Sequence, residues 1–274
     1  MMPTSRPSAR SGPVRIGYAL GGGAVRGAAH LGVLSVLEEA GIRPSVIAGT
    51  SAGAIVGAGY AAGVGIDEMA EMARVASWRE ITGRPWKRRL SVFETTPLRG
   101  WIASAIGDVT FEELSVPLAA VTCNIADGSR VVLREGEVVE AAVASSAIPG
   151  LFAPVRKGDL YLVDGGLVDN LPVGVARSLG ADLVIAVDVS PVLRTARHPE
   201  GLRDVMTSVI NIMASSTQVE SRRRADILVQ PKTESFALWE FSAITQIIET
   251  GRQAALEVLP ELLAAVGREG RQDG

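Results

Sequence analysis

A serine between two glycines is the feature that decides the fold of this chain. The sequence AGTSAGA at residues 48–54 places Ser51 between Gly49 and Gly53, after a short apolar run and before a stretch of small residues that can form a helix. A sharp strand-to-helix turn projects its serine clear of the sheet and tolerates only very small residues two positions before and after it. The pattern predicts a nucleophile elbow with Ser51 as the nucleophile. An ordinary Gly-Ser loop is the alternative, because so short a motif also occurs by chance.

A second glycine cluster lies upstream, where the sequence GGGAVRG covers residues 21–27. It follows a strand-like run and precedes a helix-like segment over residues 28–40. Backbone without side chains can approach an anion closely, and the dipole of the following helix favours negative charge there. We therefore expect the amides of Gly21, Gly22 and Gly23 to form an oxyanion hole. A dinucleotide-binding loop is the alternative, but the Gly-Thr-Ser turn occupies the place where its ribose-binding acid would lie.

A third motif supplies a carboxylate. The apolar run LYLV at residues 160–163 predicts a strand, and it leads directly into Asp164 and two glycines. An isolated Asp-Gly pair is commonly a plain turn. Beside the other two motifs, however, it indicates a carboxylate held in place at the end of a strand.

Together these motifs resemble those of bacterial patatin-like phospholipases. Two further stretches match, SSAIPG at residues 145–150 and VDGGLVDNLPV at residues 163–173, and the resemblance extends from residue 15 to about residue 190. It implies a three-layer α/β/α fold, a catalytic dyad of Ser51 and Asp164, and an oxyanion hole in the glycine loop. One departure is Ala24, which replaces the middle glycine of a strict GxGxxG pattern and leaves the individual amide donors unassigned.

The histidine content bears on the mechanism, because the chain has only two histidines, His30 and His198. His30 lies in the helix-like segment after the glycine loop, where we expect a half-buried structural imidazole. His198 lies in a polar loop that ends in proline, which indicates exposed surface. The order Ser51, Asp164, His198 nevertheless matches that of α/β-hydrolases, so a Ser-His-Asp triad in a general carboxylesterase is the alternative. The dyad is favoured because the glycine loop follows the first recognisable strand of this chain.

The dyad mechanism makes a demand on the carboxylate. Asp164 would take the proton of Ser51 as the serine attacks an ester, yet a free carboxylate has a pKa of only ~4. Burial must therefore raise the pKa of Asp164. Arg26 lies beside the loop amides and would either bind a substrate phosphate or tie the loop to a carboxylate.

Composition indicates the setting. Lys and Arg total 27 against 30 Asp and Glu, a net charge of -3, which excludes the basic signature of nucleic-acid binding. The single cysteine, Cys123, cannot form an internal disulfide and lies in an apolar run where an inert buried thiol is expected. We expect a cytoplasmic enzyme with peripheral membrane contact that acts on a lipid or acyl ester, with no metal ion and no cofactor.

We expect residues 1–13 to form a disordered tail and residues 14–270 a single domain. Residues 78–110 are predicted to be a lid-like insert. Within it, aromatic residues alternate with cations between Trp78 and Trp101, which suits either contact with lipid headgroups or a loop anchored to the core. Residues 44–66 carry no charge, but Pro44 and the glycines argue against a membrane-spanning helix.

Apolar runs separated by helical patterns predict the architecture. The runs that read as strands cover residues 16–20, 46–49, 118–122, 131–133, 160–163, 183–189 and 227–229. Their alternation predicts a three-layer α/β/α fold with a mostly parallel central sheet and catalytic groups at the carboxyl ends of its strands. Residues 243–266 read as a long outer helix. Residues 202–219 read as a helix whose apolar stripe belongs to the core or, alternatively, lines an acyl channel.

These observations favour a hydrolase of phospholipid or lysophospholipid esters. A nucleotide-binding oxidoreductase and a non-catalytic lipid-binding protein are the alternatives from other classes. The non-catalytic lipid-binding protein is disfavoured because the serine, the aspartate and the glycine loop are all present.

Overall fold

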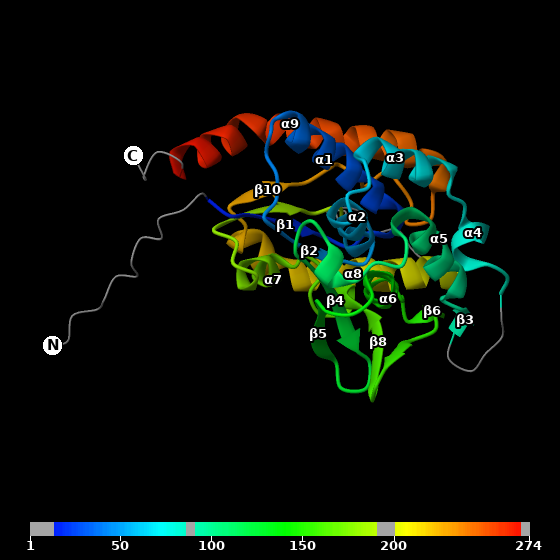
Figure 1. Cartoon of the computed structure of the whole chain (residues 1–274). Coiled ribbons are helices and arrows are strands. Elements are labelled where there is room, and N and C mark those ends of the chain that lie inside the picture. Colours follow the sequence, from blue (N-terminus) through cyan, green and yellow to red (C-terminus); the bar gives the residue numbers. More distant parts are fainter. Residues whose placement is uncertain (1–13, 86–90, 191–200, 270–274) are drawn as a thin grey trace.

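An eight-stranded sheet runs through the centre of the molecule, with helices on both faces (Figure 1). The computed structural model describes residues 14–85, 91–190 and 201–269. The strand order is β10-β9-β1-β2-β4-β8-β7, and β5 pairs with β4 outside this path. The strands are β1 (Ile16–Leu20), β2 (Val46–Thr50), β4 (Leu118–Asn124), β5 (Ser129–Leu133), β7 (Val155–Lys157), β8 (Leu160–Asp164), β9 (Leu183–Val187) and β10 (Ile227–Val229). A separate two-stranded sheet pairs β3 (Ser91–Phe93) with β6 (Gly150–Phe152).

The helices form two layers. The α-helices of the described part are α1 (Ala29–Glu39), α2 (Ala52–Ala61), α3 (Ile66–Val75), α4 (Trp78–Thr82), α5 (Thr96–Ile106), α6 (Val138–Ser145), α7 (Val173–Ser178), α8 (Leu202–Arg224) and α9 (Ile244–Glu269). Figure 1 shows α1 and α9 on one side of the sheet and α7 and α8 on the other. The predicted three-layer α/β/α fold is thus confirmed.

Alternation along the central strands separates the two cores. Tyr18 and Leu20 of β1 belong to the core beneath α1, α2 and α9, whereas Ala19 belongs to the core beneath α7. The same alternation gives Ile47 of β2 to the first core and Ala48 to the second. Because parallel strands covered on both faces are buried throughout, β1, β2 and β9 are continuous apolar runs, which is why the sequence predicts them well. The strands that it missed, β3, β6 and β7, have three residues each and carry no such run.

The half of the sheet beyond β2 is antiparallel. Strands β5 and β8 both pair antiparallel with β4, and β7 pairs antiparallel with β8. Because β5 occupies one edge of β4, β2 and β8 share the other edge. There β2 ends with Thr50 opposite Val121, and β8 ends with Asp164 opposite Thr122. The carboxyl ends of β2 and β8 therefore meet head to head.

Two predicted helices are present, with one difference in burial. The outer helix is α9, which packs on α1 so closely that an added Cβ at Gly32 would lie 1.9 Å from the carbonyl oxygen of Ile248. Helix α8 spans the second prediction, but Val205 and Val209 of its apolar stripe are exposed, so a core role is wrong for those two side chains. Solvent covers them because α8 lies at the surface of the second layer. Residues 44–66 form β2 and α2, and no helix among the described residues is both long and apolar enough to cross a membrane.

The insert at residues 78–110 is anchored by its aromatic residues. The ring of Trp78 makes edge contacts with Phe93 at 5.7 Å and with Trp239 at 5.0 Å between ring centroids. Arg99, a cation of the same insert, forms salt bridges with Glu137 and Glu140. These contacts agree with the anchored-loop interpretation for the described part of the insert. The lid-like role of the insert stays a prediction, and Trp86 and the tail at residues 1–13 lie outside the described residues.

Candidate active site

Ser51 occupies a strained turn between β2 and α2. Its backbone has φ 54° and ψ −124°, in the left-handed region that residues other than glycine rarely adopt. The flanking glycines are required by close packing: an added Cβ at Gly49 would lie 2.6 Å from the Cα of Ala54, and one at Gly53 would lie 2.1 Å from the carbonyl oxygen of Leu20. The turn therefore has the geometry of an elbow that presents a serine at the end of its strand.

A neighbouring serine holds this turn in place. The amide of Ser51 donates to Ser145 Oγ at 2.8 Å, and Ser145 Oγ donates to the carbonyl oxygen of Val121 at 2.6 Å. Ser145 thus links the turn to β4. The sequence contains it in the SSAIPG stretch, but no local pattern indicates its contact with a residue 94 positions away.

Asp164 lies beside Ser51 because β8 ends where β2 ends. Ser51 and Asp164 line the same cavity, where the Ser51 hydroxyl favours the ionised Asp164 carboxylate. The amide of Gly166 donates to Asp164 Oδ1 at 2.8 Å. Both side chains are more than nine-tenths buried. Burial raises the pKa of Asp164 to about 6, although the Ser51 hydroxyl and the Gly166 amide act in the opposite direction. The structure therefore brings together the two residues that the sequence nominated, and the aspartate has the raised pKa that a base requires.

The glycine loop differs from the prediction in which amides it leaves free. The amide of Gly21 donates to the carbonyl oxygen of Val187 at 3.0 Å, and that of Gly22 donates to the carbonyl oxygen of Asn170 at 3.1 Å. Both therefore hold the loop to the fold. Within the described part of the chain, the amides of Gly23 and Ala24 have no acceptor. Of the three predicted donors, Gly23 is the one that remains available.

Ala24 is the position where the sequence departs from the GxGxxG pattern, and its backbone shows why a glycine suits that place. Its φ is 50°, in the left-handed region where a Cβ is unfavourable. The structure thus contains two residues other than glycine with positive φ among those described, Ala24 and Ser51, and both border the same site.

A buried polar network supports the loop from below. Asn170 Nδ2 donates to the carbonyl oxygen of Gly22 at 3.2 Å and to Ser190 Oγ at 3.1 Å. Gln218 Nε2 of helix α8 donates to the same Ser190 oxygen at 2.9 Å. An added Cβ at Gly22 would lie 2.5 Å from Asn170 Oδ1, so this glycine is needed for close contact. No local sequence pattern indicates Ser190 or Gln218, because both reach the loop only through tertiary contacts.

His30 supports the loop from the other side. Its Nε2 lies 2.8 Å from the carbonyl oxygen of Gly21, to which it donates in the neutral ring. The ring is fully buried, and burial lowers the pKa of His30 to about 4, so the ring is neutral at pH 7. The structure agrees with a structural imidazole, although it is fully rather than half buried. His198 lies outside the described residues.

Arg26 is buried and holds the loop without an ion pair. Its Nε donates to the carbonyl oxygen of Phe236 at 2.9 Å, and its Nη1 donates to Asn211 Oδ1 at 3.2 Å. Of the two predicted roles, a tether to a carboxylate is not formed among the described residues: Arg26 makes no salt bridge there, although the charge of Glu234 favours its protonated form. Burial lowers the pKa of Arg26 to about 10, so the side chain stays charged at pH 7.

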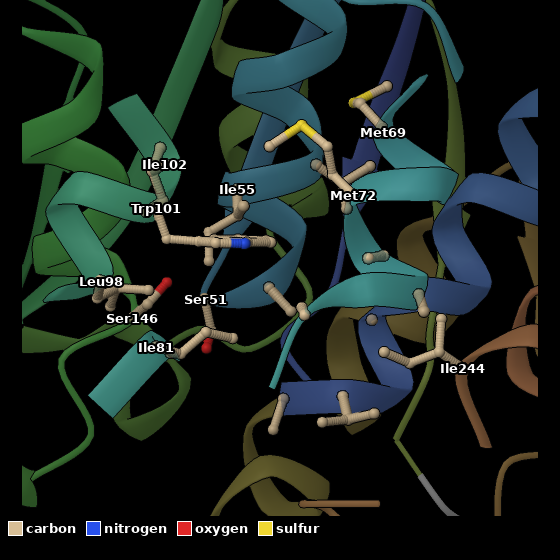
Figure 2. A pocket seen from close by; sticks show the side chains of 18 of the residues that line it. Ser51, Ile55, Met69, Met72, Ile81, Leu98, Trp101, Ile102, Ser146 and Ile244 are labelled. Atoms are coloured by element: carbon tan, nitrogen blue, oxygen red, sulfur yellow. The ribbon is translucent and has the colours of Figure 1, made fainter. Parts of the chain in front are cut away.

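Two cavities meet at Ser51. The larger has a volume of about 170 Å³ and is lined almost entirely by apolar side chains, among them Ile55, Met69, Met72, Leu98, Ile102 and Ile244 (Figure 2). The smaller has a volume of about 50 Å³, and its polar lining includes Arg26, Asp164, Asn170, Ser190 and Asn211. Ser51 lines both cavities, so a molecule bound at its hydroxyl can extend in two directions of different polarity.

Other candidate groups contribute little to the site. Cys123 is buried in β4, and burial raises the pKa of its thiol, as expected for an inert cysteine. In the described part of the chain, no three His, Cys, Asp or Glu side chains are grouped so that they could hold a metal ion.

Comparisons with known proteins agree with these features. The sequence profile of the family described as patatin-like phospholipase matches residues 18–177, more than half of the chain. An uncharacterized NTE family protein of Mycobacterium bovis is 36% identical over 178 residues, which cover 64% of this chain and 49% of that protein. Lysophospholipase nte1 of Emericella nidulans is 29% identical over 281 residues, which cover 90% of this chain and 18% of that protein. The chain thus spans about half, or less, of the length of these relatives.

A solved structure extends the likeness to the fold. VipD from Legionella pneumophila superposes with a TM-score of 0.54 at 14% identity, over 92% of this chain and 68% of the VipD chain. The matched profile covers the end of β1, the glycine loop, the Ser51 turn and Asp164. The chain belongs to the patatin-like phospholipase family.

Proposed function

We propose that this chain is a serine acyl hydrolase that cleaves carboxylic ester bonds of phospholipids or lysophospholipids. The observation that carries the proposal is the pairing of Ser51 and Asp164 in one cavity, where burial raises the pKa of the carboxylate to about 6. Near neutral pH such a carboxylate is ionised and is still more basic than an ordinary one. The pair lies where an apolar cavity meets a polar one, which suits an amphipathic ester.

The reaction follows from these positions. Ser51 Oγ attacks the ester carbonyl carbon while its proton passes to Asp164. The tetrahedral intermediate collapses with cleavage of the bond to the alcohol oxygen, and the alcohol leaves with the proton from Asp164. A water molecule then attacks the acyl-enzyme with Asp164 again acting as the base, which releases the fatty acid and restores the serine. His30 takes no part, because its ring is neutral and bonds to the glycine loop.

The oxyanion of each intermediate needs preorganised donors. We assign this role to the amides of Gly23 and Ala24, because the amides of Gly21 and Gly22 are bonded to the fold. Both residues line the cavity that also contains Asp164. Gly21 and Gly22 then act as the rigid base of the loop.

Each of the two cavities binds one end of the substrate. The larger cavity takes the acyl chain, because its lining is apolar and burial of hydrocarbon there is favourable. The smaller cavity takes the alcohol portion, with its phosphate near Arg26. A buried guanidinium that hydrogen-bonds only to neutral acceptors among the described residues is costly, and an anionic ligand would offset that cost.

The relatives support this substrate class. The family is described as patatin-like phospholipase, and the matched protein of Emericella nidulans is named a lysophospholipase. We expect the enzyme to act in the cytoplasm, in peripheral contact with the membrane that holds its substrate.

Covalent labelling tests the proposal. A fluorophosphonate probe should modify wild-type protein at Ser51, as located by peptide mass spectrometry, and Ser51→Ala should remove both the labelling and the hydrolysis of lysophospholipid. Ser129→Ala, an exposed serine on β5, is the matched control and should behave as wild type. A folded Ser51→Ala protein that still hydrolyses the lipid would refute the proposal.

The triad alternative is tested separately. His198→Ala should retain hydrolysis of lysophospholipid if the dyad is sufficient. A folded His198→Ala variant that has lost turnover would instead establish a Ser-His-Asp carboxylesterase.

A further inference from the structure

The larger cavity is not uniformly apolar. Ser146 lies at the end of α6 and lines it, with only 7% of its surface exposed. Its Oγ has no hydrogen-bond partner among the described residues. Figure 2 shows this side chain between Leu98 and Ser51, at the lower left of the cavity. A buried hydroxyl without a partner is unfavourable, so its presence beside the reacting serine needs a reason.

The adjacent serine does not share this state. Ser145 is also buried, and its Oγ both accepts from the Ser51 amide and donates to Val121. The hydroxyl of Ser145 therefore has hydrogen-bond partners within the fold, whereas that of Ser146 has none among the described residues. The unsatisfied one is the one that lines the cavity.

A second donor faces the same space. Figure 2 shows the indole ring of Trp101 lying across the cavity between Ile55 and Ser51. The contacts of Trp101 with described residues include a hydrogen bond accepted by its carbonyl oxygen, but none donated by its indole nitrogen. A cavity for plain hydrocarbon gains nothing from a buried hydroxyl without a partner and an indole N–H near its reactive end.

We propose, on the basis of the function proposed above, that this cavity is specific for acyl chains that carry an oxygen atom close to the carboxyl end, as a hydroxyl or keto group. Ser146 is the specificity-determining residue, and Trp101 contributes the second donor. The ester carbonyl oxygen is not the group that Ser146 binds, because we assign that oxygen to the free amides of Gly23 and Ala24 on the glycine loop. Ser146 follows Ser145, which bonds to the nucleophile, so its hydroxyl meets the first carbons of the chain rather than its far end.

Matched esters test this inference. The full chain is assayed with the 4-nitrophenyl esters of octanoate and of 3-hydroxyoctanoate, which share a leaving group and a chain length. The measured quantity is the ratio of kcat/KM for the hydroxylated ester to that for the plain ester. A neutral hydrogen bond contributes up to about a factor of ten, so Ser146→Ala should lower this ratio by about tenfold, chiefly by slowing the hydroxylated ester.

Two further variants control for shape. Ser146→Thr keeps the hydroxyl and should keep the ratio within about twofold of wild type, which a purely steric role would not produce. Ile102→Val changes an apolar residue of the same cavity and should alter both esters alike. Trp101→Phe keeps the aromatic ring but removes the donor, and should lower the ratio by a few-fold.

The outcomes separate this inference from the proposed function. An unchanged ratio in a Ser146→Ala protein that melts as wild type does would overturn the inference while leaving ester hydrolysis intact. An equal loss on both esters would also overturn it, because Ser146 would then serve the ester group or the attacking water. Failure of wild type to hydrolyse either ester, without labelling of Ser51, would refute the proposed function and this inference with it.

Discussion

The two cavities that meet at Ser51 differ in how they are built. The larger one is lined by apolar side chains, many of them from α2, α3 and α5 and others from distant segments, such as Leu31 of α1 and Ile244 of α9. The smaller one is formed where the ends of β1, β8 and β9 approach α8, and its groups are joined by hydrogen bonds between distant segments. The first can change in size without moving the reacting groups, whereas the second is part of their support. We therefore expect substitutions in the two cavities to have different consequences.

The largest effect should come from Asp164, which serves a substrate in either cavity. Asp164→Asn should lower kcat/KM by at least about a thousandfold on neutral and phosphate-bearing esters alike, because the base is lost. Its melting temperature at pH 7 should rise, since a buried carboxylate with a raised pKa disfavours folding when ionised. Asp159→Asn, on the exposed turn before β8, is the control and should leave both quantities unchanged. Retention of a tenth of the activity by Asp164→Asn would contradict the assignment.

The pH dependence should be the same for substrates of both kinds. The reaction needs ionised Asp164, whose pKa is raised to about 6 by burial. Activity should be constant above that pH and fall about tenfold per pH unit below it, which amounts to about a hundredfold at pH 4. A profile of kcat/KM from pH 4 to 8 measures this, and a midpoint near pH 4 would show that burial does not raise the pKa of Asp164.

The same raised pKa means that the stability contributed by protonated Asp164 is present at low pH and is lost as the pH rises through about 6.

Arg26 should separate the substrates. Arg26→Met should lower kcat/KM for lysophospholipid by about tenfold to a hundredfold, the loss expected for a charge-assisted hydrogen bond. A monoacylglycerol with the same acyl chain lacks the phosphate and should lose less than about threefold. Arg26→Lys keeps the charge and should recover part of the activity on lysophospholipid. Equal losses on both lipids would show that Arg26 acts by holding the loop through Phe236 and Asn211.

Filling the larger cavity should shorten the preferred acyl chain. Ala105 of α5 lines that cavity, and Ala105→Phe should reduce kcat/KM by about tenfold for a long-chain 4-nitrophenyl ester while leaving the butyrate ester within about threefold. Ser104→Phe places the same ring on the exposed side of the helix and should change neither. A uniform loss in Ala105→Phe across chain lengths would show that the acyl chain does not lie there.

The smallest effect concerns the strain in the glycine loop. Ala24→Gly should raise the free energy of unfolding by about 0.5–1 kcal/mol, because glycine adopts positive φ without a steric penalty. Ala28→Gly is the control at a helical position with φ −58°, and it should lower that free energy by a similar amount. Urea denaturation measures both. A destabilised Ala24→Gly protein would mean that the left-handed backbone is not under strain.

Local sequence patterns were sufficient for much of the fold. The buried strands β1, β2 and β9 appear as apolar runs, because helices cover both faces of the sheet. The turn at Ser51 is also local, since Gly49 and Gly53 are fixed by contacts within and next to their own elements. Asp164 could be nominated from its glycines and from the family resemblance. The short strands and the exposed face of α8 could not be predicted, because their environment depends on what lies beside them.

The sequence alone determined which residues are chemically competent, but the tertiary structure decided how they act. The parallel-sheet rule places Ser51 at a carboxyl edge, yet Asp164 reaches it from an antiparallel strand, because β2 and β8 share one edge of β4 and end on adjacent residues. Likewise, three successive glycines predict an anion site. In the structure, the amides of Gly21 and Gly22 donate to the carbonyl oxygens of Val187 and Asn170, and the next two amides of the loop are free within the described part of the chain. Strand pairing and the use of backbone donors arise between distant segments, so no local pattern encodes them.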